Sequence, residues 1–304
     1  MAPRPFRFAA QGGPFTDGAA LAEHARRVES LGYRELFSYD HIGTVDPFAP
    51  LVTAAAATER LGIGPLTVNN ELHHPVLLAR TAANVDALSG GRLVLGLGTG
   101  HKPDEHDWIG APLRPPGPRV DRFAESLTVL RALLDTGSVD FDGEHHHVHV
   151  ADLGVRPARE RVPFLIGGHG RRVVGLAGRH ADVFQFTGLQ HADGKADLTG
   201  FAVAELDPRA RWLAAAAGDR DADIERSALV QVVGVGPDAP SPADVGARFG
   251  LPADVVRETP FALLGSVEEI TDKLGRLRER LGISHYVIRE PEVFAPVVAA
   301  LDGT

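Results

Sequence analysis

Blocks of apolar and polar residues alternate along the chain in the way that strands and helices do. The clearest block spans residues 61–100. Its β-rich run at 63–68 predicts a short strand, and apolar residues at helical spacing over 75–88 predict a helix that opens on Pro75. A second apolar run at 93–97 predicts another strand. A strand–helix–strand unit of this kind implies parallel strands with a right-handed crossover.

The same alternation continues on both sides of this unit. Further strands are predicted at 6–10, 33–39, 164–170 (with its turn), 181–186, 226–233 and 284–288. Helices are predicted at 16–31, 48–60, 119–134, 171–179, 201–217 and 266–281, the last with a Ser-x-x-Glu capping box. About eight strands alternating with helices fit a (β/α)8 barrel, with doubly wound open sheets as the competing arrangement. No repeat or linker interrupts the pattern, so one domain over 1–304 is expected.

Three stretches depart from the pattern and are interpreted as insertions. They are the proline-rich stretch 101–118, the polar stretch 187–200 and the stretch 236–259, which holds two weak helical patches. Long loops inside a compact domain are typically functional or mobile. We therefore expect the walls of a substrate pocket to come from these insertions.

Composition narrows the classes of function. The 304 residues carry 40 acidic and 31 basic side chains, a net charge of −9, which argues against a nucleic-acid partner. The absence of cysteine excludes disulfides, thiolate zinc sites and cysteine nucleophiles. The longest apolar runs fall far short of a membrane span and no signal peptide is visible, so we expect a cytoplasmic protein without a membrane partner.

The carboxyl ends of the predicted strands carry the candidate site, because (β/α)8 barrels place their active sites there. Asp40 and His41 follow the strand at 33–39, and imidazole suits proton transfer near neutral pH. Two glycine turns, at 98–100 and 167–170, offer backbone N–H groups of the kind that bind anions. Taken alone, Asp40 would also fit a residue that caps a turn, with His41 as a neighbour without a role, and the glycines would also fit plain tight turns.

Two motifs resemble a known family. Leu88-Ser-Gly-Gly-Arg92 and Leu95-Gly-Leu-Gly-Thr-Gly100 resemble stretches of the luciferase-like monooxygenases, and more narrowly of their coenzyme F420 (deazaflavin) dependent oxidoreductases. The resemblance extends more weakly over nearly the whole chain. It implies an α/β fold, a TIM barrel of the bacterial-luciferase-like (β/α)8 type with insertions in the βα loops. It also implies coenzyme F420 as cofactor, with FMN as the alternative.

The resemblance assigns roles to residues as well. It implies that His41 is catalytic, holding or receiving a proton, and that Asp40 hydrogen-bonds the cofactor. It places Thr67, Asn69 and Asn70 against the flavin ring, where relatives often have a non-proline cis peptide bond whose position the sequence does not reveal. The implied phosphate site combines both glycine turns and comprises Thr99, Gly100, Ile166, Gly167, Gly168, His169 and Gly170.

Departures from the family bear on the substrate. His101 stands where the sugar-phosphate dehydrogenases of this family have a glutamate acid, and Thr44-Val45 stand where they have a tryptophan. Oxidation of sugar phosphates is therefore not expected, and His101 becomes a second candidate for a catalytic proton donor. The histidines at 145–147 and 149 fall in a segment similar to the family's metal-free hairpin, so no metal site is expected.

These observations lead to one leading hypothesis and two alternatives. The leading hypothesis is an F420-dependent oxidoreductase that transfers a hydride between F420 and a small organic substrate. The close alternative is an FMNH2-dependent luciferase-like monooxygenase, and the third is a non-catalytic ligand-binding barrel. The partner expected is a small-molecule substrate, and a homodimer stays open. The sequence does not reveal which substrate is used.

Overall fold

The computed structural model describes residues 4–192, 195–301 and 304, and in this part of the chain the main sheet has nine strands. The strands are β1 (Arg7–Gln11), β2 (Glu35–Ser38), β3 (Gly62–Pro65), β4 (Val68–Asn69), β5 (Leu95–Gly98), β8 (Phe164–Gly167), β9 (Val183–Phe186), β12 (Glu225–Leu229) and β15 (Ile283–Ile288). Hydrogen bonds link them in the order β3-β2-β1-β15-β12-β9-β8-β5-β4.

The two ends of this order belong to one strand of the barrel. β3 and β4 are consecutive pieces of the strand predicted at 63–68, and β3 also bridges to the start of the next strand through Ile63 and Leu93. The ring of strands is therefore nearly closed, as in a (β/α)8 barrel. The predicted barrel is confirmed, and the open doubly wound alternative is excluded.

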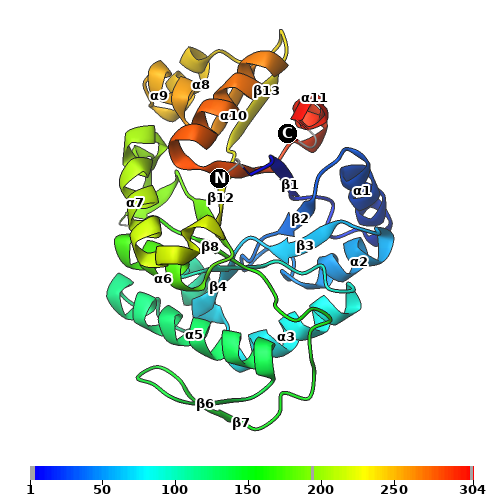
Figure 1. Cartoon of the computed structure of the whole chain (residues 1–304), viewed down its shortest axis with the longest axis vertical. Helices are drawn as coiled ribbons and strands as arrows, with labels where there is room; N and C mark the ends of the chain where they lie inside the picture. The colour runs from blue at the N-terminus through cyan, green and yellow to red at the C-terminus, as the bar shows by residue number, and fades with distance from the viewer. Residues whose placement is uncertain (1–3, 193–194, 302–303) are drawn as a thin grey trace. The chain divides into compact units, whose positions relative to one another are not determined.

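Helices alternate with the strands along the chain, as Figure 1 shows. They are α1 (Gly18–Ser30), α2 (Ala49–Ala57), α3 (Pro75–Leu88), α4 (Pro103–Trp108), α5 (Pro116–Thr136), α6 (Arg171–His180), α7 (Leu206–Ala217), α8 (Pro242–Phe249), α9 (Ala253–Glu258), α10 (Val267–Leu281) and α11 (Pro291–Leu301). The predicted capping box forms at α10, where the N–H of Ser266 donates to Glu269 at 2.8 Å. None of the helices within the described ranges is long and apolar enough to cross a membrane.

The chain divides into two compact units. The first unit comprises Met1–Gly12, Arg27–Leu36 and Gly167–Thr304, and the second comprises Gly13–Arg26 and Phe37–Ile166. The expectation of one domain over the whole chain stays a prediction.

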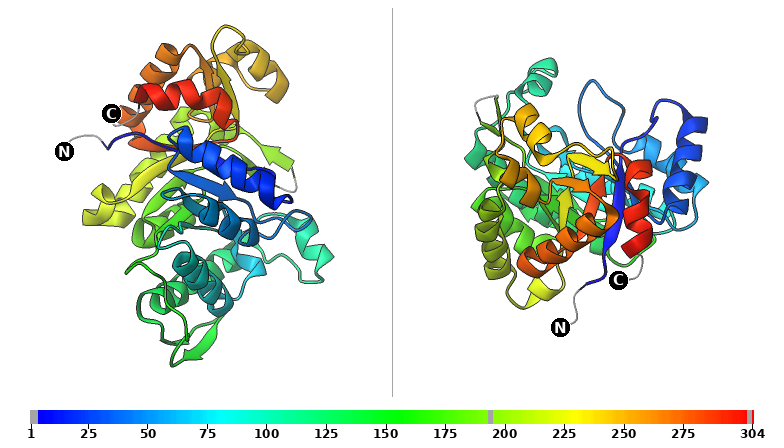
Figure 2. Two further views of the ribbon diagram at one scale, coloured as in Figure 1. Left: turned by 90° about the vertical axis from the view of Figure 1, so that its right-hand side faces the viewer. Right: turned by 90° about the horizontal axis from the view of Figure 1, so that it is seen from above.

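The first unit contains β1, β15, β12 and β9, which pair in parallel. Its core is aromatic: Phe8 of β1 packs on Phe294 of α11 with ring centroids 5.5 Å apart, and Figure 2 shows α11 lying beside β1. The strand predicted at 226–233 stops at Leu229, because Gln231 donates its N–H to the carbonyl of Phe261 instead. The chain continues as β13 (Val232–Val235), which pairs with β14 (Ala262–Gly265) outside the barrel sheet.

The second unit contains β3, β4, β5 and most of β8. Glycine lets its backbones approach closely: a Cβ on Gly64 would lie 2.0 Å from the carbonyl oxygen of Val94, and one on Gly96 would lie 2.1 Å from that of Pro65. The predicted hairpin forms from β6 (Val139–Asp142) and β7 (His147–Val150), and in Figure 1 it extends below α5.

The three insertions have secondary structure of their own. Stretch 101–118 contains α4, which the sequence pattern did not predict. Stretch 187–200, of which residues 193 and 194 lie outside the described ranges, contains the antiparallel pair β10 (Gln190–Ala192) and β11 (Lys195–Asp197). Stretch 236–259 contains α8 and α9, so its two helical patches are confirmed.

Candidate active site

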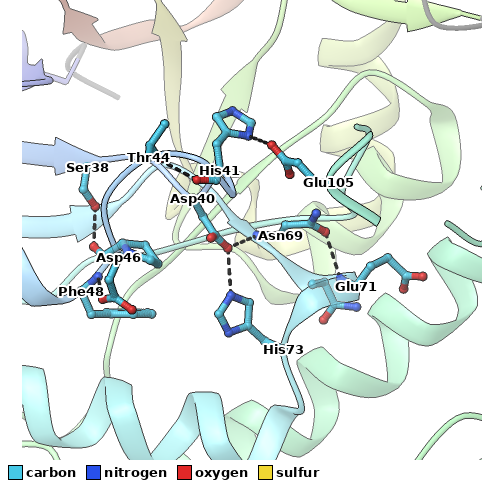
Figure 3. Close-up of polar contacts among 12 residues, drawn as sticks. Ser38, Asp40, His41, Thr44, Asp46, Phe48, Asn69, Glu71, His73 and Glu105 are labelled. Atoms are coloured by element: carbon cyan, nitrogen blue, oxygen red, sulfur yellow. Dashed lines mark hydrogen bonds and ion pairs between the residues drawn. The ribbon is translucent and has the colours of Figure 1, made fainter. Parts of the chain in front are cut away.

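Asp40 lies just beyond the end of β2, in the second unit, and is buried. Its Oδ2 atom accepts a hydrogen bond from the backbone N–H of Asn69 at 2.8 Å and lies 2.9 Å from Nε2 of His73. Figure 3 shows both contacts converging on the one carboxylate. Asp40 therefore joins the end of β2 to β4 and to the turn that follows β4. A hydrogen bond from the cofactor to Asp40 stays a prediction.

The turn after β4 is held by a buried ion-pair network. Glu71 lies in the 3-10 turn η1 (Asn70–Leu72), and its fully buried carboxylate is 3.3 Å from Arg122 and 2.9 Å from Arg114. Arg122, from α5, also donates to two carbonyl groups of the turn, including that of His73 at 2.9 Å. A cation fixed by a long helix thus positions the residues that contact Asp40.

His41 forms the second contact of interest in this unit. Its Nδ1 atom lies 2.7 Å from Oε1 of Glu105, which is buried and comes from α4 (Figure 3). Lys102 lies 3.6 Å from the same carboxylate oxygen. The ring of His101 stands nearly perpendicular to that of His41, with centroids 5.8 Å apart. The two predicted catalytic histidines are therefore neighbours, and Glu105 is a partner that sequence reasoning did not assign.

Backbone geometry explains several of the predicted ring-binding residues. The peptide bond between Leu66 and Thr67 is cis, which supplies the position that the sequence did not reveal. Gly100 has φ +81°, and a Cβ there would lie 2.0 Å from Oδ1 of Asn69. A Cβ on Gly98 would lie 2.6 Å from Oγ1 of Thr67. Both glycines are thus needed for the end of β5 to pack against the end of β4.

Three other predicted residues of this unit differ in exposure. Asn70 is buried, and its Nδ2 donor has no hydrogen-bond partner among the described residues. Thr99 is half-buried just after β5. Ile166 is fully buried in β8, so it can offer a ligand little more than its backbone. The orphaned amide of Asn70 marks a polar position that a bound molecule would satisfy.

The second glycine turn belongs to the first unit, apart from Ile166. Gly170 is the N-cap residue of α6, and a Cβ placed on it would meet nothing within 4 Å. Helix geometry leaves the first-turn N–H groups of α6 without intrahelical acceptors. The N–H of Gly168 instead donates to the carbonyl of Gln185 at 3.4 Å. The free N–H groups of this turn are therefore those of the first turn of α6 rather than that of Gly168, and the predicted phosphate binding stays a prediction.

Gln185 at the end of β9 was expected at the pocket from its place in the predicted strand, whereas Thr187, just after β9, was missed. Thr187 Oγ1 and Gln185 Nε2 are buried without partners in the described part of the chain, and both side chains face Gly167 at 3.7–3.9 Å from where its Cβ would stand. The sequence could have indicated Thr187 as a site residue, because it directly follows the strand predicted at 181–186. Arg209 of α7, which donates to the carbonyl of Thr187 at 2.7 Å, carried no signal because it is distant in sequence.

In the histidine-rich hairpin, two histidines of β7 pair with aspartates of β6. His147 and His149 lie 3.0 and 2.5 Å from Asp142 and Asp140 across the two strands, and these side chains are exposed. Burial lowers the pKa of His146 to about 4, and its Nε2 atom lies 3.0 Å from the hydroxyl of Ser126. No group of acidic and histidine side chains among the described residues has the arrangement of a metal site.

Comparison with known proteins places this geometry in context. The family model described as luciferase-like monooxygenase matches residues 4–239. An F420-dependent glucose-6-phosphate dehydrogenase of Intrasporangium calvum is 33% identical over 54% of this chain and 52% of its own length. A 5,10-methylenetetrahydromethanopterin reductase of Methanopyrus kandleri is 24% identical over 89% of this chain and 88% of its own length. A 4-hydroxyprotoasukamycin monooxygenase of Streptomyces nodosus subsp. asukaensis is 35% identical over 45% of this chain and 38% of its own length.

Solved structures support the fold. An F420-dependent secondary alcohol dehydrogenase superposes with a TM-score of 0.76 at 19% identity, over 98% of this chain and 99% of its own. The long-chain alkane monooxygenase LadA superposes with a TM-score of 0.78 at 16% identity, over 98% of this chain and 91% of its own. The chain spans about half the length of the first curated relatives, at 52%, 57% and 47%. The relatives are oxidoreductases, in agreement with the predicted class of enzyme.

Proposed function

Because this chain belongs to the luciferase-like monooxygenase family, we propose that it is an F420-dependent oxidoreductase that transfers a hydride between F420 and a small organic substrate. Relatives named as F420-dependent glucose-6-phosphate dehydrogenases support the choice of cofactor. The substrate differs from theirs in this proposal, since His101 replaces the glutamate acid expected in those enzymes.

The contact between His41 and Glu105 is the observation that carries the proposal. A carboxylate 2.7 Å from Nδ1 favours a proton on that nitrogen and leaves Nε2 as the acceptor. Glu105 is buried, so its charge is poorly screened and also stabilises the imidazolium that forms when Nε2 takes a proton. His41 is thus prepared to remove a proton from a substrate alcohol or amine, or to return one in the reverse direction.

The residues present fit a deazaflavin cofactor. When bound, F420 supplies the hydride chemistry at its C5 atom. In the second unit, the unpaired Nδ2 donor of Asn70 offers a hydrogen bond to a ring carbonyl. In the first unit, the open helix end at Gly170 and the unpaired hydroxyl of Thr187 offer donors to a phosphate. These orphaned donors support a bound polar ligand over the non-catalytic alternative without a cofactor.

His101 has a secondary role in this proposal. Its ring lies edge-on to that of His41, with centroids 5.8 Å apart, so both imidazoles can reach the same substrate proton. In this proposal His41 is the proton acceptor because Glu105 holds its Nδ1 atom at 2.7 Å.

An FMNH2-dependent monooxygenase is the second candidate. It is favoured by the similarity to 4-hydroxyprotoasukamycin monooxygenase, which at 35% is higher than the identity to the F420-dependent relatives but covers less of the chain. The orphaned donors would serve FMN as well as F420, because both carry a phosphate. The pair of His41 and Glu105 would then act on a substrate proton.

Titration of the apo-protein with F420 and with FMN, followed by cofactor fluorescence, tests the choice. We expect F420 to bind more tightly, because Arg171 and Arg172 at the start of α6 would meet its acidic tail. Equal or tighter binding of FMN would refute the F420 assignment. Analytical ultracentrifugation of the same sample decides between a monomer and a homodimer.

A further inference from the structure

Trp108 is a large apolar side chain that the fold leaves exposed. It lies at the end of α4 with 64% of its surface accessible, and Ile109, which follows it, is 50% exposed. Large apolar side chains that stand exposed next to each other are typical of a surface that binds a ligand or a partner. What this surface binds follows from the residues that Trp108 contacts.

Two contacts of α4 place Trp108 beside His41. Glu105 and Trp108 are three residues apart, so they share one face of the helix. Glu105 contacts Nδ1 of His41 at 2.7 Å (Figure 3). Trp108 lies over the backbone of Gly43, two residues after His41, since a Cβ placed on Gly43 would stand 3.3 Å from Cζ3 of the indole. Gly43 has φ +92° and no side chain, which lets the indole approach this closely.

Further aromatic side chains of the second unit lie near His41. The ring of Tyr39 has its centroid 6.5 Å from that of His41, and the ring of Phe15 lies 5.8 Å from that of Tyr39. Both aromatic residues are half-buried, so part of each ring is accessible. Lys102 lies 3.6 Å from the Glu105 carboxylate, which pairs this cation with an anion of the protein. The surface next to His41 therefore offers a ligand apolar contact more than charge.

We propose that Trp108, together with Tyr39, binds the apolar part of the substrate and selects an uncharged alcohol whose carbinol carbon carries a hydrocarbon ring or chain. The inference rests on the proposed function for the reaction, but not for the apolar surface. In the oxidation, the hydroxyl proton passes to Nε2 of His41 and the hydride of the carbinol C–H bond passes to C5 of F420. The C–O bond becomes C=O, so the alcohol is oxidised and F420 is reduced. A polyhydroxylated substrate would leave hydroxyl groups without partners against the rings.

A matched pair of ring alcohols tests the apolar surface without the cofactor. Cyclohexanol and myo-inositol share the same carbon ring, but myo-inositol carries a hydroxyl on every carbon. The chain has two tryptophans, so Trp212→Phe leaves Trp108 as the only tryptophan reporter. We expect cyclohexanol to shift the emission of Trp108 to shorter wavelength, because it displaces water from the indole, and myo-inositol to leave the emission unchanged. No shift with cyclohexanol, or an equal shift with myo-inositol, would overturn the proposal.

Variants of Trp108 test the selectivity in the F420-loaded enzyme. Trp108→Ser should lower kcat/KM for cyclohexanol at least about tenfold, whereas Trp108→Phe keeps an apolar ring and should retain most of it. Both variants should keep the wild-type melting temperature, because the side chain is largely exposed. Trp212→Phe is the matched control, since Trp212 is half-buried on α7 in the first unit. Wild-type kcat/KM for cyclohexanol in Trp108→Ser would overturn the proposal.

The apolar surface and the proposed function fail separately. If the wild type binds neither F420 nor FMN, the proposed function fails, and the emission of Trp108 with the two ring alcohols still supports or refutes the apolar surface. Analytical ultracentrifugation of Trp108→Ser tests a second copy of the chain as the alternative occupant. A variant that loses a dimer but keeps the wild-type kcat/KM for cyclohexanol would show that Trp108 contacts another subunit, and the proposal would be overturned.

Discussion

At the scale of single residues, the pairing of His41 with Glu105 sets the expected chemistry. His41→Ala should lower kcat by about 10²–10⁴-fold, the range for a positioned acid–base group, with a much smaller effect on cofactor affinity. Glu105→Gln keeps an acceptor for Nδ1 but removes the negative charge, so the fall in kcat should be smaller than in His41→Ala. Steady-state kinetics of the two variants measure both losses.

His101→Ala is the counter-test for this assignment. A turnover that is abolished in His101→Ala and nearly normal in His41→Ala would give the proton role to His101. Equal losses of kcat in both variants would mean that both histidines take part in the proton transfer.

Asp40 holds the turn after β4 in place, so its removal should lower the stability of the protein as well as cofactor binding. The carboxylate accepts from the N–H of Asn69 and contacts His73, so Asp40→Ala leaves a buried N–H group unsatisfied. A loss of about 1–3 kcal/mol in the free energy of unfolding is expected. Urea denaturation measures this loss, and cofactor titration of the same variant measures the predicted binding role. A fully stable variant that only binds cofactor poorly would show that the structural contact is unimportant.

At the scale of elements, the clamp of α5 on the turn after β4 should be essential. Arg122→Met leaves the carboxylate of Glu71 buried and half-neutralised, and breaking such a pair typically costs ~3–5 kcal/mol. Arg114→Met is the control, because Arg114 is 46% exposed and its removal leaves Glu71 paired with the more deeply buried Arg122, so a smaller destabilisation is expected. Equal destabilisation of both variants, measured by urea denaturation, would contradict the role given to α5.

The second glycine turn also needs a well-chosen variant. A Cβ on Gly168 would stand 2.5 Å from Cγ1 of Val173, so Gly168→Val would disturb α6 itself and would not isolate ligand binding. Gly170→Val puts its side chain into open space at the helix end where an anion would sit. It should weaken FMN binding at least about tenfold and leave riboflavin binding and the melting temperature unchanged. Wild-type FMN binding by this variant would show that the phosphate does not bind at α6.

At the scale of the whole molecule, the sequence predicted the barrel better than it predicted the site. Periodicity located the strands because each buries a short apolar run between polar loops, and the strand ends then indicated Asp40, His41 and the glycine turns. Pattern did not show that the third strand is divided into β3 and β4, because the apolar run at 63–68 is continuous across the break. It could not pair His41 with Glu105 either, because their contact spans 64 positions and depends on a short helix inside an insertion.

Global stability should depend on pH through Lys273, which α10 buries in the first unit. Its Nζ atom donates to the carbonyls of Ala262 at 2.6 Å and Val256 at 3.5 Å. Burial, and then the charge of Arg276, lower its pKa from 10.5 to about 7, with Glu258 opposing the shift. Between these two values the unfolded chain binds a proton that the folded chain does not, so stability rises with pH through this window. Below pH 7 Lys273 is protonated in both states, so the full cost of burying its ammonium group lowers the free energy of unfolding.

Two substitutions at Lys273 separate the charge from the hydrogen bonds. Lys273→Met removes the titrating group, so its free energy of unfolding should lose the rise that the wild type shows between pH 7 and pH 10, a window set by the lowered pKa. Lys273→Arg keeps a charge that cannot be shed in this range, so it should be less stable than the wild type, and increasingly so as pH rises. Urea denaturation at pH 7, 8, 9 and 10, within that same window, measures the three curves. Parallel curves for the wild type and Lys273→Met would mean that Lys273 stays protonated in the folded protein, held as a cation by its two carbonyl acceptors.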